Sequence, residues 1–127
     1  VMDIVRSKLY TPVGLRSLSP DDSRYEGHYG GNAFMRDSVY HQGTVWSWLL
    51  GPFVEAGMKT AGADFKTEAL AIIDRFTYHL NEGCIGTVSE IFDGDAPHHP
   101  RGCVAQAWGV AEILRVIKTY SLFHAGS

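Results

Sequence analysis

Side chains that could do chemistry concentrate in two irregular stretches, residues 11–42 and 82–102, and at the starts of the segments that follow them. Carboxylates, imidazoles, amides and aromatic rings are all present there: Asp37, Glu90, Asp93, Asp95, His41, His98, His99, Gln42, Gln106, Tyr40, Trp46, Phe92 and Trp108. Aromatic rings can cover the apolar face of a sugar, and the polar groups can fix its hydroxyls. This combination favours a neutral, polyhydroxylated ligand.

Part of this set also has the side chains of a metal site. Carboxylate and imidazole are ordinary ligands for Zn²⁺ or Mn²⁺, and the candidates are Asp93, Asp95, His98 and His99. Their spacing matches no established metal motif, and Pro97 and Pro100 favour a rigid turn instead. We therefore expect no metal and no other cofactor.

Apolar residues recur at helical spacing in four segments, which predicts helices at about residues 1–10, 44–61, 64–80 and 104–120. The second and fourth are apolar nearly all round, so we expect them to be buried, with Gly51-Pro52 kinking or dividing the second. The third has one apolar stripe, typical of an amphipathic surface helix, formed by Phe65, Ala69, Ile72, Ile73, Phe76 and Leu80. Between the helices, residues 87–92 could be a short strand or merely extended.

These helices must position the chemical groups. Short connections make neighbouring helices antiparallel, so the helices at 44–61 and 104–120 should start at the same end of the domain. That places segments 41–43, 89–90 and 101–103 on one shared rim. Two apolar helices with an amphipathic helix outside them are typical of an α/α barrel. The predicted fold class is therefore all-α, a partial barrel of about four helices with two long loops at one rim.

Composition limits the classes of function. The chain has 127 residues, of which 45% are hydrophobic and 20% charged, with a formal charge of -3. These values indicate a single globular domain, and without a basic surplus we expect no nucleic-acid partner and no anionic membrane surface. The longest apolar stretch, around residues 45–54, is shorter than the roughly 20 residues of a membrane span. The first residues do not resemble a signal peptide, so we expect a cytoplasmic protein whose two cysteines are reduced and mostly buried.

Three longer motifs resemble a known family. Residues 40–53, beginning Tyr-His-Gln-Gly-Thr-Val-Trp, residues 89–94, Ser-Glu-Ile-Phe-Asp-Gly, and residues 101–108, beginning Arg-Gly-Cys, resemble the C-terminal domain of glycogen debranching enzymes. This is the amylo-α-1,6-glucosidase family of bacteria and archaea. The Thr-Pro-x-Gly-Leu-Arg segment at residues 11–16 is similar to that family as well. The similarity extends over nearly the whole chain, in order and at matching separations.

The resemblance implies an (α/α)6 barrel of which residues 1–127 are the C-terminal portion. It implies inverting hydrolysis of α-1,6-linked glucose at branch points of an α-glucan such as glycogen or limit dextrin. Glu90 of Ser-Glu-Ile-Phe-Asp-Gly matches the general base. The substrate-binding positions are expected at Asp37, Tyr40, His41, Gln42, Trp46 and Asp93.

The motifs also depart from the family pattern. The general acid of the family, an Asp from an earlier part of the barrel, has no clear match in this chain. Ser47 stands where Pro is usual, and His99 where Arg is usual. Inversion requires two carboxyl groups roughly 6.5–9.5 Å apart, so half of the acid–base pair is missing from these residues.

Three hypotheses follow. The chain is a debranching α-1,6-glucosidase domain that works as part of a complete barrel, or a module that binds α-glucan without cleaving it, or a truncated helical oligomer without activity. An inner face without its barrel partners would be exposed, and such surfaces promote self-association. We therefore expect either a homo-oligomer, burying Trp46, Trp48, Leu49 and residues of the 104–120 helix, or the remainder of a longer barrel in that place.

Overall fold

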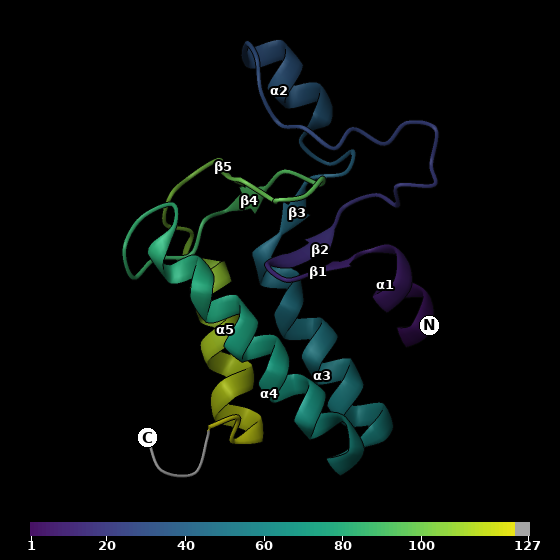
Figure 1. Cartoon of the computed structure of the whole chain (residues 1–127), viewed down its shortest axis with the longest axis vertical. Helices are drawn as coiled ribbons and strands as arrows, with labels where there is room; N and C mark the ends of the chain where they lie inside the picture. The colour runs from purple at the N-terminus through teal and green to yellow at the C-terminus, as the bar shows by residue number, and fades with distance from the viewer. Residues whose placement is uncertain (124–127) are drawn as a thin grey trace.

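The computed structural model describes residues 1–123, in which three long helices extend from one side of a small sheet (Figure 1). The helices are α1 (Met2–Lys8), α2 (Ala33–Val39), α3 (Leu50–Ala61), α4 (Ala63–Thr77) and α5 (Ala107–Tyr120), with short 3-10 turns η1 (Ser47–Leu49) and η2 (Tyr78–Asn81). The strands are β1 (Tyr10–Thr11), β2 (Gly14–Arg16), β3 (Val45–Trp46), β4 (Ile91–Phe92) and β5 (Pro100–Arg101).

The sheet corrects the predicted fold class. Within residues 1–123 the five strands form one antiparallel sheet in the order β1-β2-β3-β4-β5, so the fold is mixed α/β and the all-α prediction is wrong. Leu15 pairs with Trp46, Val45 with Phe92, and Ile91 with Arg101. Strands of two or three residues are too short to show the alternation of period two that reveals a strand in a sequence.

The same pairing divides the helix expected at residues 44–61. Val45 and Trp46 are extended and lie between β2 and β4, so α3 begins only at Leu50, after η1. β-branched and aromatic residues favour a strand where neighbouring strands can pair with them. The sequence suggested a break at Gly51-Pro52. In the structure the helix is instead interrupted before these residues, and Gly51 and Pro52 lie inside α3.

The three long helices run in the expected directions. α3 and α5 both lead away from the sheet, and α4 returns towards it (Figure 1). α3 packs against both α4 and α5. α3 ends at Ala61 and is followed by Gly62, whose φ of 56° is in the left-handed region that glycine adopts without strain. The direction of the chain thus reverses before α4.

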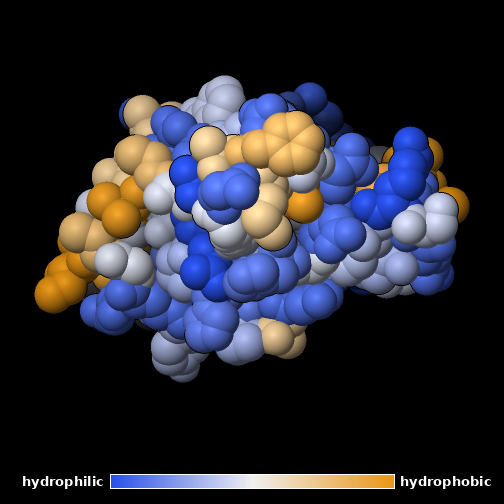
Figure 2. Space-filling model, turned by 90° about the horizontal axis from the view of Figure 1, so that it is seen from above, coloured by the Kyte–Doolittle hydropathy of each residue, from blue (hydrophilic) through white to orange (hydrophobic). Residues whose placement is uncertain are grey.

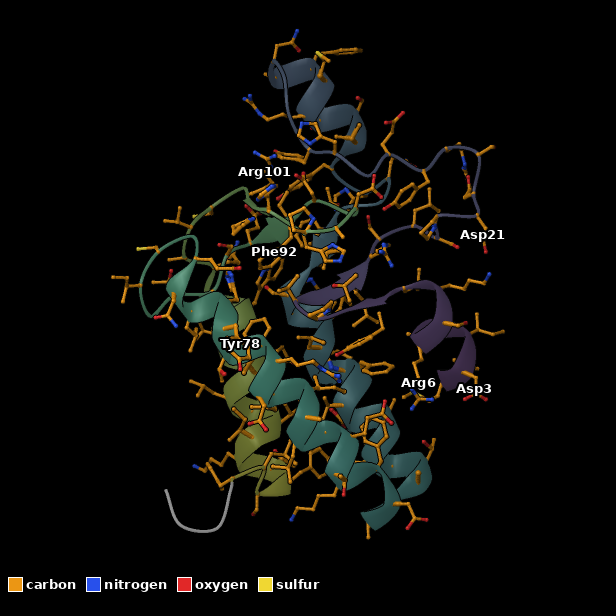
Figure 3. The ribbon with its side chains drawn as sticks, in the orientation of Figure 1. Asp3, Arg6, Asp21, Tyr78, Phe92 and Arg101 are labelled. Atoms are coloured by element: carbon orange, nitrogen blue, oxygen red, sulfur yellow. The ribbon has the colours of Figure 1, made fainter. Side chains whose placement is uncertain are left out.

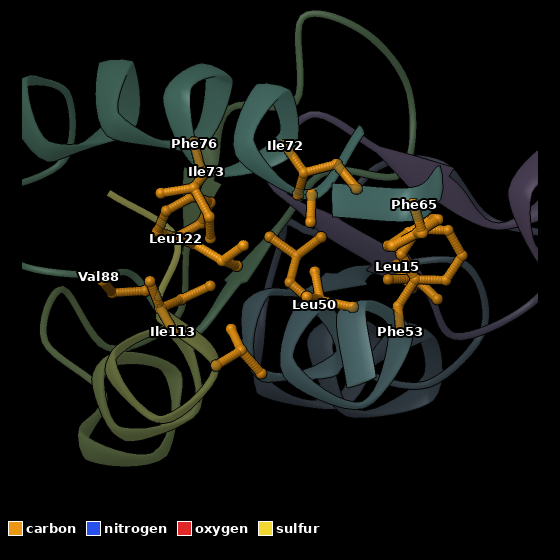
Figure 4. Packing of buried hydrophobic residues seen from close by; sticks show 13 residues of the cluster. Leu15, Leu50, Phe53, Phe65, Ile72, Ile73, Phe76, Val88, Ile113 and Leu122 are labelled. Carbon is orange, nitrogen blue, oxygen red and sulfur yellow. The ribbon is translucent and has the colours of Figure 1, made fainter. Parts of the chain in front are cut away.

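The core lies between these helices and the sheet (Figure 4). The predicted stripe on α4 is confirmed: its members from Phe65 to Phe76 are buried, and Leu80 is partly buried against them. The other core residues are Leu50, Phe53 and Val54 of α3, Ile113 and Val116 of α5, Leu15 of β2, Val88 and Leu122. A Cβ at Gly57 would lie 2.3 Å from the Phe65 ring, so this glycine lets α3 and α4 approach closely.

Two other expectations differ from the structure. α5 is buried on one face only, because Trp108 and Leu114 on the same helix are 49% and 60% exposed. Cys84 and Cys103 are both exposed, so the expectation of mostly buried thiols is wrong. They lie in irregular segments at the surface, where no apolar neighbours enclose them. No helix in residues 1–123 is both long and apolar enough to cross a bilayer.

Candidate functional site

Glu90 lies immediately before β4 and is held by residues from two other segments. Its N–H donates to the carbonyl of Cys103 at 2.9 Å, and the N–H of Cys103 donates to Oε2 of Glu90, also at 2.9 Å. The hydroxyl of Tyr40 donates to Oε1. The predicted meeting of segments 89–90 and 101–103 is therefore confirmed, with Tyr40 joining them from the residue before His41.

These hydrogen bonds orient the Glu90 carboxylate but do not occupy all of its acceptor positions. An ionised carboxylate has about four acceptor positions, and the described donors Tyr40 and Cys103 take one on each oxygen. The half-buried Glu90 side chain therefore keeps acceptor positions for a water molecule. A carboxylate that is oriented and still has open acceptor positions meets the geometric need of a general base.

Tyr40 is a permanent donor in this arrangement. Burial raises the pKa of its phenol, and the hydrogen bond to Glu90 and the negative charge of Glu90 raise it further. The phenol therefore stays protonated at neutral pH, and its hydroxyl remains a hydrogen-bond donor to the Glu90 carboxylate.

Asp93 is buried and paired with Arg101, which lies nearer to α2 than Phe92 does (Figure 3). The guanidinium Nη2 of Arg101 is 2.8 Å from Oδ2, and the N–H of Tyr29 donates to Oδ1 at 2.8 Å. Burial alone would raise the pKa of Asp93, but these hydrogen bonds and the positive charges of Arg101 and His28 outweigh it and lower the pKa. With 7% of its side chain exposed, Asp93 acts mainly by holding Arg101 and the backbone of Tyr29.

This pair gives a prediction about stability and pH. Asp93 has a lowered pKa in the folded state, so it stabilises the fold above its unfolded pKa of about 3.9, and this contribution is lost as pH falls through the folded pKa. We expect Asp93→Asn to lower the free energy of unfolding at pH 7 by about 1–3 kcal/mol and to flatten the loss of stability below about pH 4. Urea denaturation at pH values from about 2.5 to about 7 measures both, because this range extends below and above the unfolded pKa of about 3.9.

The control is Asp3→Asn, because the Asp3 side chain is 97% exposed. It should change the unfolding free energy by less than about 0.5 kcal/mol. An Asp93→Asn protein with the stability and acid slope of the unsubstituted chain would contradict the role of the pair.

Aromatic rings form a wall beside Glu90. The His41 ring stacks on Trp46 with centroids 5.1 Å apart and planes 8° apart, and Tyr40 contacts Trp46 edge-on at 4.9 Å. Trp108 contacts both Trp46 and Trp48. A depression of about 210 Å³ opens there, lined by Ser17, His41, Trp46, Trp48, Leu49 and Trp108. Trp46 is 6% exposed, so His41 and Trp108 supply most of the accessible ring surface.

The remaining predicted residues lie around this centre. Asp37 is exposed on α2 and shares a second depression, of about 250 Å³, with Tyr40, Tyr29, Ala33 and Arg36. Gln42 is half-buried, and its carbonyl accepts the N–H of Glu26 at 2.6 Å. Seen from above, this end of the molecule is mostly hydrophilic, with apolar side chains at two margins and in a smaller group near the centre (Figure 2). The structure thus joins Tyr40, His41, Trp46 and Glu90 by direct contact and places Asp37 and Gln42 at the edge.

The candidate metal ligands have other partners. Asp93 pairs with Arg101, Asp95 accepts the hydroxyl of Tyr25 at 2.9 Å, and Nδ1 of His98 contacts the carbonyl of Asp93 at 3.0 Å. Within residues 1–123 no group of three or more His, Cys, Asp or Glu side chains is arranged to hold a metal ion.

Sequence reasoning missed residues that act through their backbone or from a distant segment. The N–H groups of Cys103 and Tyr29 carry no signal in a sequence, because every residue except proline has such a group. Arg101 could have been found as a cation for the candidate carboxylates, since it belongs to the segment 101–103 that was expected on the same rim as Glu90. His79 is buried in η2 and bonds the residue before Glu90, and its place in a helical pattern concealed that contact.

Comparison with known proteins identifies the family of this chain. A family model described as amylo-alpha-1,6-glucosidase matches residues 1–115. The glycogen debranching enzyme of Saccharomyces cerevisiae is 39% identical over 51 residues, which cover 35% of this chain and 3% of the yeast protein. The chain therefore corresponds to a small part of that relative's length. Since the family model extends over most of the sequence, including all the residues that surround Glu90, this chain belongs to the amylo-alpha-1,6-glucosidase family.

Proposed function

We propose that this chain carries the general-base half of an inverting α-1,6-glucosidase site, with Glu90 as the base. The observation that carries this proposal is the Glu90 carboxylate, oriented by Tyr40 and Cys103 and placed beside an aromatic wall. The substrate is the branch point of an α-glucan such as glycogen or limit dextrin, which the family membership supports. Residues 1–127 are then the C-terminal portion of a glucosidase domain.

In the proposed reaction, Glu90 removes a proton from water as the water oxygen attacks the anomeric carbon. The bond to the leaving oxygen breaks on the opposite face, where a carboxylic acid must protonate that oxygen. We assign this acid to residues outside the chain, contributed by the remainder of a longer enzyme. Such a division explains why the base and its supports are complete here while a matching acid is absent from the sequence motifs.

The other predicted residues take supporting roles in this proposal. The exposed imidazole of His41 covers the apolar face of a glucose unit, and Trp46 supports that ring from beneath. Tyr40 orients the base and borders the hollow that contains Asp37, where a second sugar unit can lie. Gln42 binds hydroxyl groups at the edge, and Asp93 contributes through Arg101.

A second candidate is binding of α-glucan without hydrolysis. The aromatic depression favours it, because stacking on His41 and Trp108 requires no acid–base pair. Under either proposal we place the protein and its glucan in the cytoplasm.

The test uses α-D-glucosyl fluoride, whose fluoride leaves without protonation, so a base can act alone. Water supplies the hydroxyl group, Glu90 takes the proton, and fluoride departs with the electrons of the C–F bond. Proton NMR of the first product should show β-glucose, the inverted anomer. Release of α-glucose, or no release above the spontaneous rate, would overturn the base assignment.

A binding measurement separates the two candidates. Quenching of the tryptophan fluorescence by maltotetraose reports contact with the wall, since Trp46, Trp48 and Trp108 are the three tryptophans of the chain. Binding without fluoride release supports the second candidate, and absence of both contradicts each of them.

We also propose that an apolar groove between α4 and α5 is covered by a second copy of the chain or by the remainder of a longer enzyme. The groove has a volume of about 230 Å³ and is lined by Ile73, Phe76, Thr77, Leu80, Gly86, Val88, Val110, Ile113, Leu114 and Ile117. Trp46 is already buried within the chain, so the contact would involve Leu114 instead, which lines the groove and is 60% exposed.

Light scattering coupled to size exclusion tests self-association of the purified chain. We expect a dimer or larger species at tens of micromolar, and conversion to a monomer by Leu114→Lys, because a charge on this surface would be costly to bury. A monomer at that concentration would rule out the second copy as the cover.

A further inference from the structure

His79 has a fully buried side chain and contacts the residue that precedes Glu90. Its Nε2 is 3.0 Å from the backbone nitrogen of Ser89, and its Nδ1 is 3.1 Å from Oε2 of Glu82. The ring is also packed edge-on against Phe92, with centroids 4.5 Å apart. His79 therefore connects η2 to Ser89 and to β4, the strand that follows Glu90.

The partners of His79 determine its tautomer. A backbone N–H can only donate, so Nε2 must present a lone pair to Ser89, and in the neutral ring the proton then lies on Nδ1. That proton faces the Glu82 carboxylate, which accepts it. Both ring nitrogens are satisfied in one orientation, and the ring cannot flip without losing both bonds.

Four successive backbone polar groups, from the Val88 carbonyl to the Glu90 N–H, have hydrogen-bond partners. The Val88 carbonyl accepts the N–H of Gln106 at 2.9 Å, and the N–H of Glu90 donates to Cys103. Between them, the N–H of Ser89 donates to His79, and its carbonyl accepts the hydroxyl of Ser47 at 3.0 Å. Two of these four partners are side chains, and both are buried.

We propose that His79, assisted by Ser47, is a positioning residue that sets the direction of the Glu90 carboxylate by holding the Ser89 peptide. This inference rests on the proposed function of Glu90 as base. A rotation of the Ser89–Glu90 peptide would carry the carboxylate away from Tyr40 and Cys103. Displacements of about 1 Å at a reacting group can lower rates about 100-fold.

The first test compares His79→Leu with His79→Gln. Leucine has no acceptor for the Ser89 N–H, whereas the amide oxygen of glutamine can reach the position of Nε2. We expect His79→Leu to lower kcat for α-glucosyl fluoride about 10- to 100-fold with little change in KM, and His79→Gln to restore most of the loss. Equal rates for the two variants would overturn the proposal.

The second test reads the position of the carboxylate directly. The amide proton of Cys103 reports its hydrogen bond to Glu90 Oε2, and it can be followed by ¹H–¹⁵N NMR whether or not the protein turns over substrate. We expect its resonance to shift in His79→Leu and to stay near its original position in His79→Gln. An unshifted Cys103 amide in His79→Leu would overturn the positioning role.

Controls separate positioning from loss of stability and from failure of the proposed function. Ile72→Val removes a methyl group from the core without touching a hydrogen bond of residues 88–90, and it should leave the Cys103 amide and kcat unchanged. If His79→Leu does not fold, Ser47→Ala removes the other side-chain partner of Ser89 and should shift the same resonance. A wild-type chain without turnover would contradict the proposed function, while the NMR comparison would still decide the role of His79.

Discussion

Replacing Glu90 with glutamine is expected to lower the rate of α-glucosyl fluoride hydrolysis by about 10²–10⁴-fold, the usual contribution of a general base. Glutamine has nearly the same shape and can still accept from Tyr40 or Cys103, but an amide does not take a proton from water. The fold should therefore persist while the reaction is lost. Initial rates with a fluoride-selective electrode measure the change.

Glu68→Gln is the matched control for this substitution. Glu68 lies on α4 and pairs with Arg6 at 2.9 Å, so its replacement also removes a carboxylate that accepts hydrogen bonds. It should leave the rate unchanged and the unfolding free energy within about 1 kcal/mol. A Glu90→Gln protein that kept its rate to within a factor of three (roughly 0.6 kcal/mol in the barrier) would show that Glu90 is not the base.

Replacing Phe92 with alanine is expected to lower the free energy of unfolding by about 3–5 kcal/mol. Phe92 is fully buried in β4, where it pairs with Val45 and packs its ring against His79. Its removal leaves a cavity at the junction of sheet and helices, and Glu90 lies two residues away in the sequence. Urea denaturation at pH 7 measures the loss, and we expect the activity to fall as the folded fraction falls.

The control for Phe92 is Phe34→Ala on α2. Phe34 is 82% exposed, so the same chemical change should alter the unfolding free energy by less than about 0.5 kcal/mol. A loss below about 1 kcal/mol for Phe92→Ala would mean that the sheet contributes little to the stability of the domain.

The parts of the fold that could be predicted are those with a long, regular pattern. The stripe from Phe65 to Leu80 repeats over several turns, so α4 and its buried face follow from the sequence. The sheet could not be predicted in this way, because its strands are two or three residues long and each pairs with a partner many positions away. Trp46 shows the result: a residue expected on a helix lies in a strand instead.

The candidate site divides along the same line. Glu90, Tyr40 and His41 belong to contiguous motifs whose resemblance to a family could be seen, and the structure brings them into contact. Arg101 and His79 could not be assigned partners, because their contacts with Asp93 and Ser89 depend on how the strands and η2 are placed. Side-chain identity marks a functional residue more readily than the supports that orient it.

The strand order of the sheet, which follows the order of the chain, bears on how the protein matures during synthesis. Each strand from β2 onward can be added to the one made before it, without passing through a loop already in place. The two donors to Glu90 come from opposite directions along the chain, Tyr40 from an earlier segment and Cys103 from a later one. A nascent chain that has left the ribosome only as far as residue 95 offers Glu90 the hydroxyl of Tyr40 but not the N–H of Cys103. The Glu90 carboxylate therefore acquires both hydrogen bonds only after residues 100–106 have emerged.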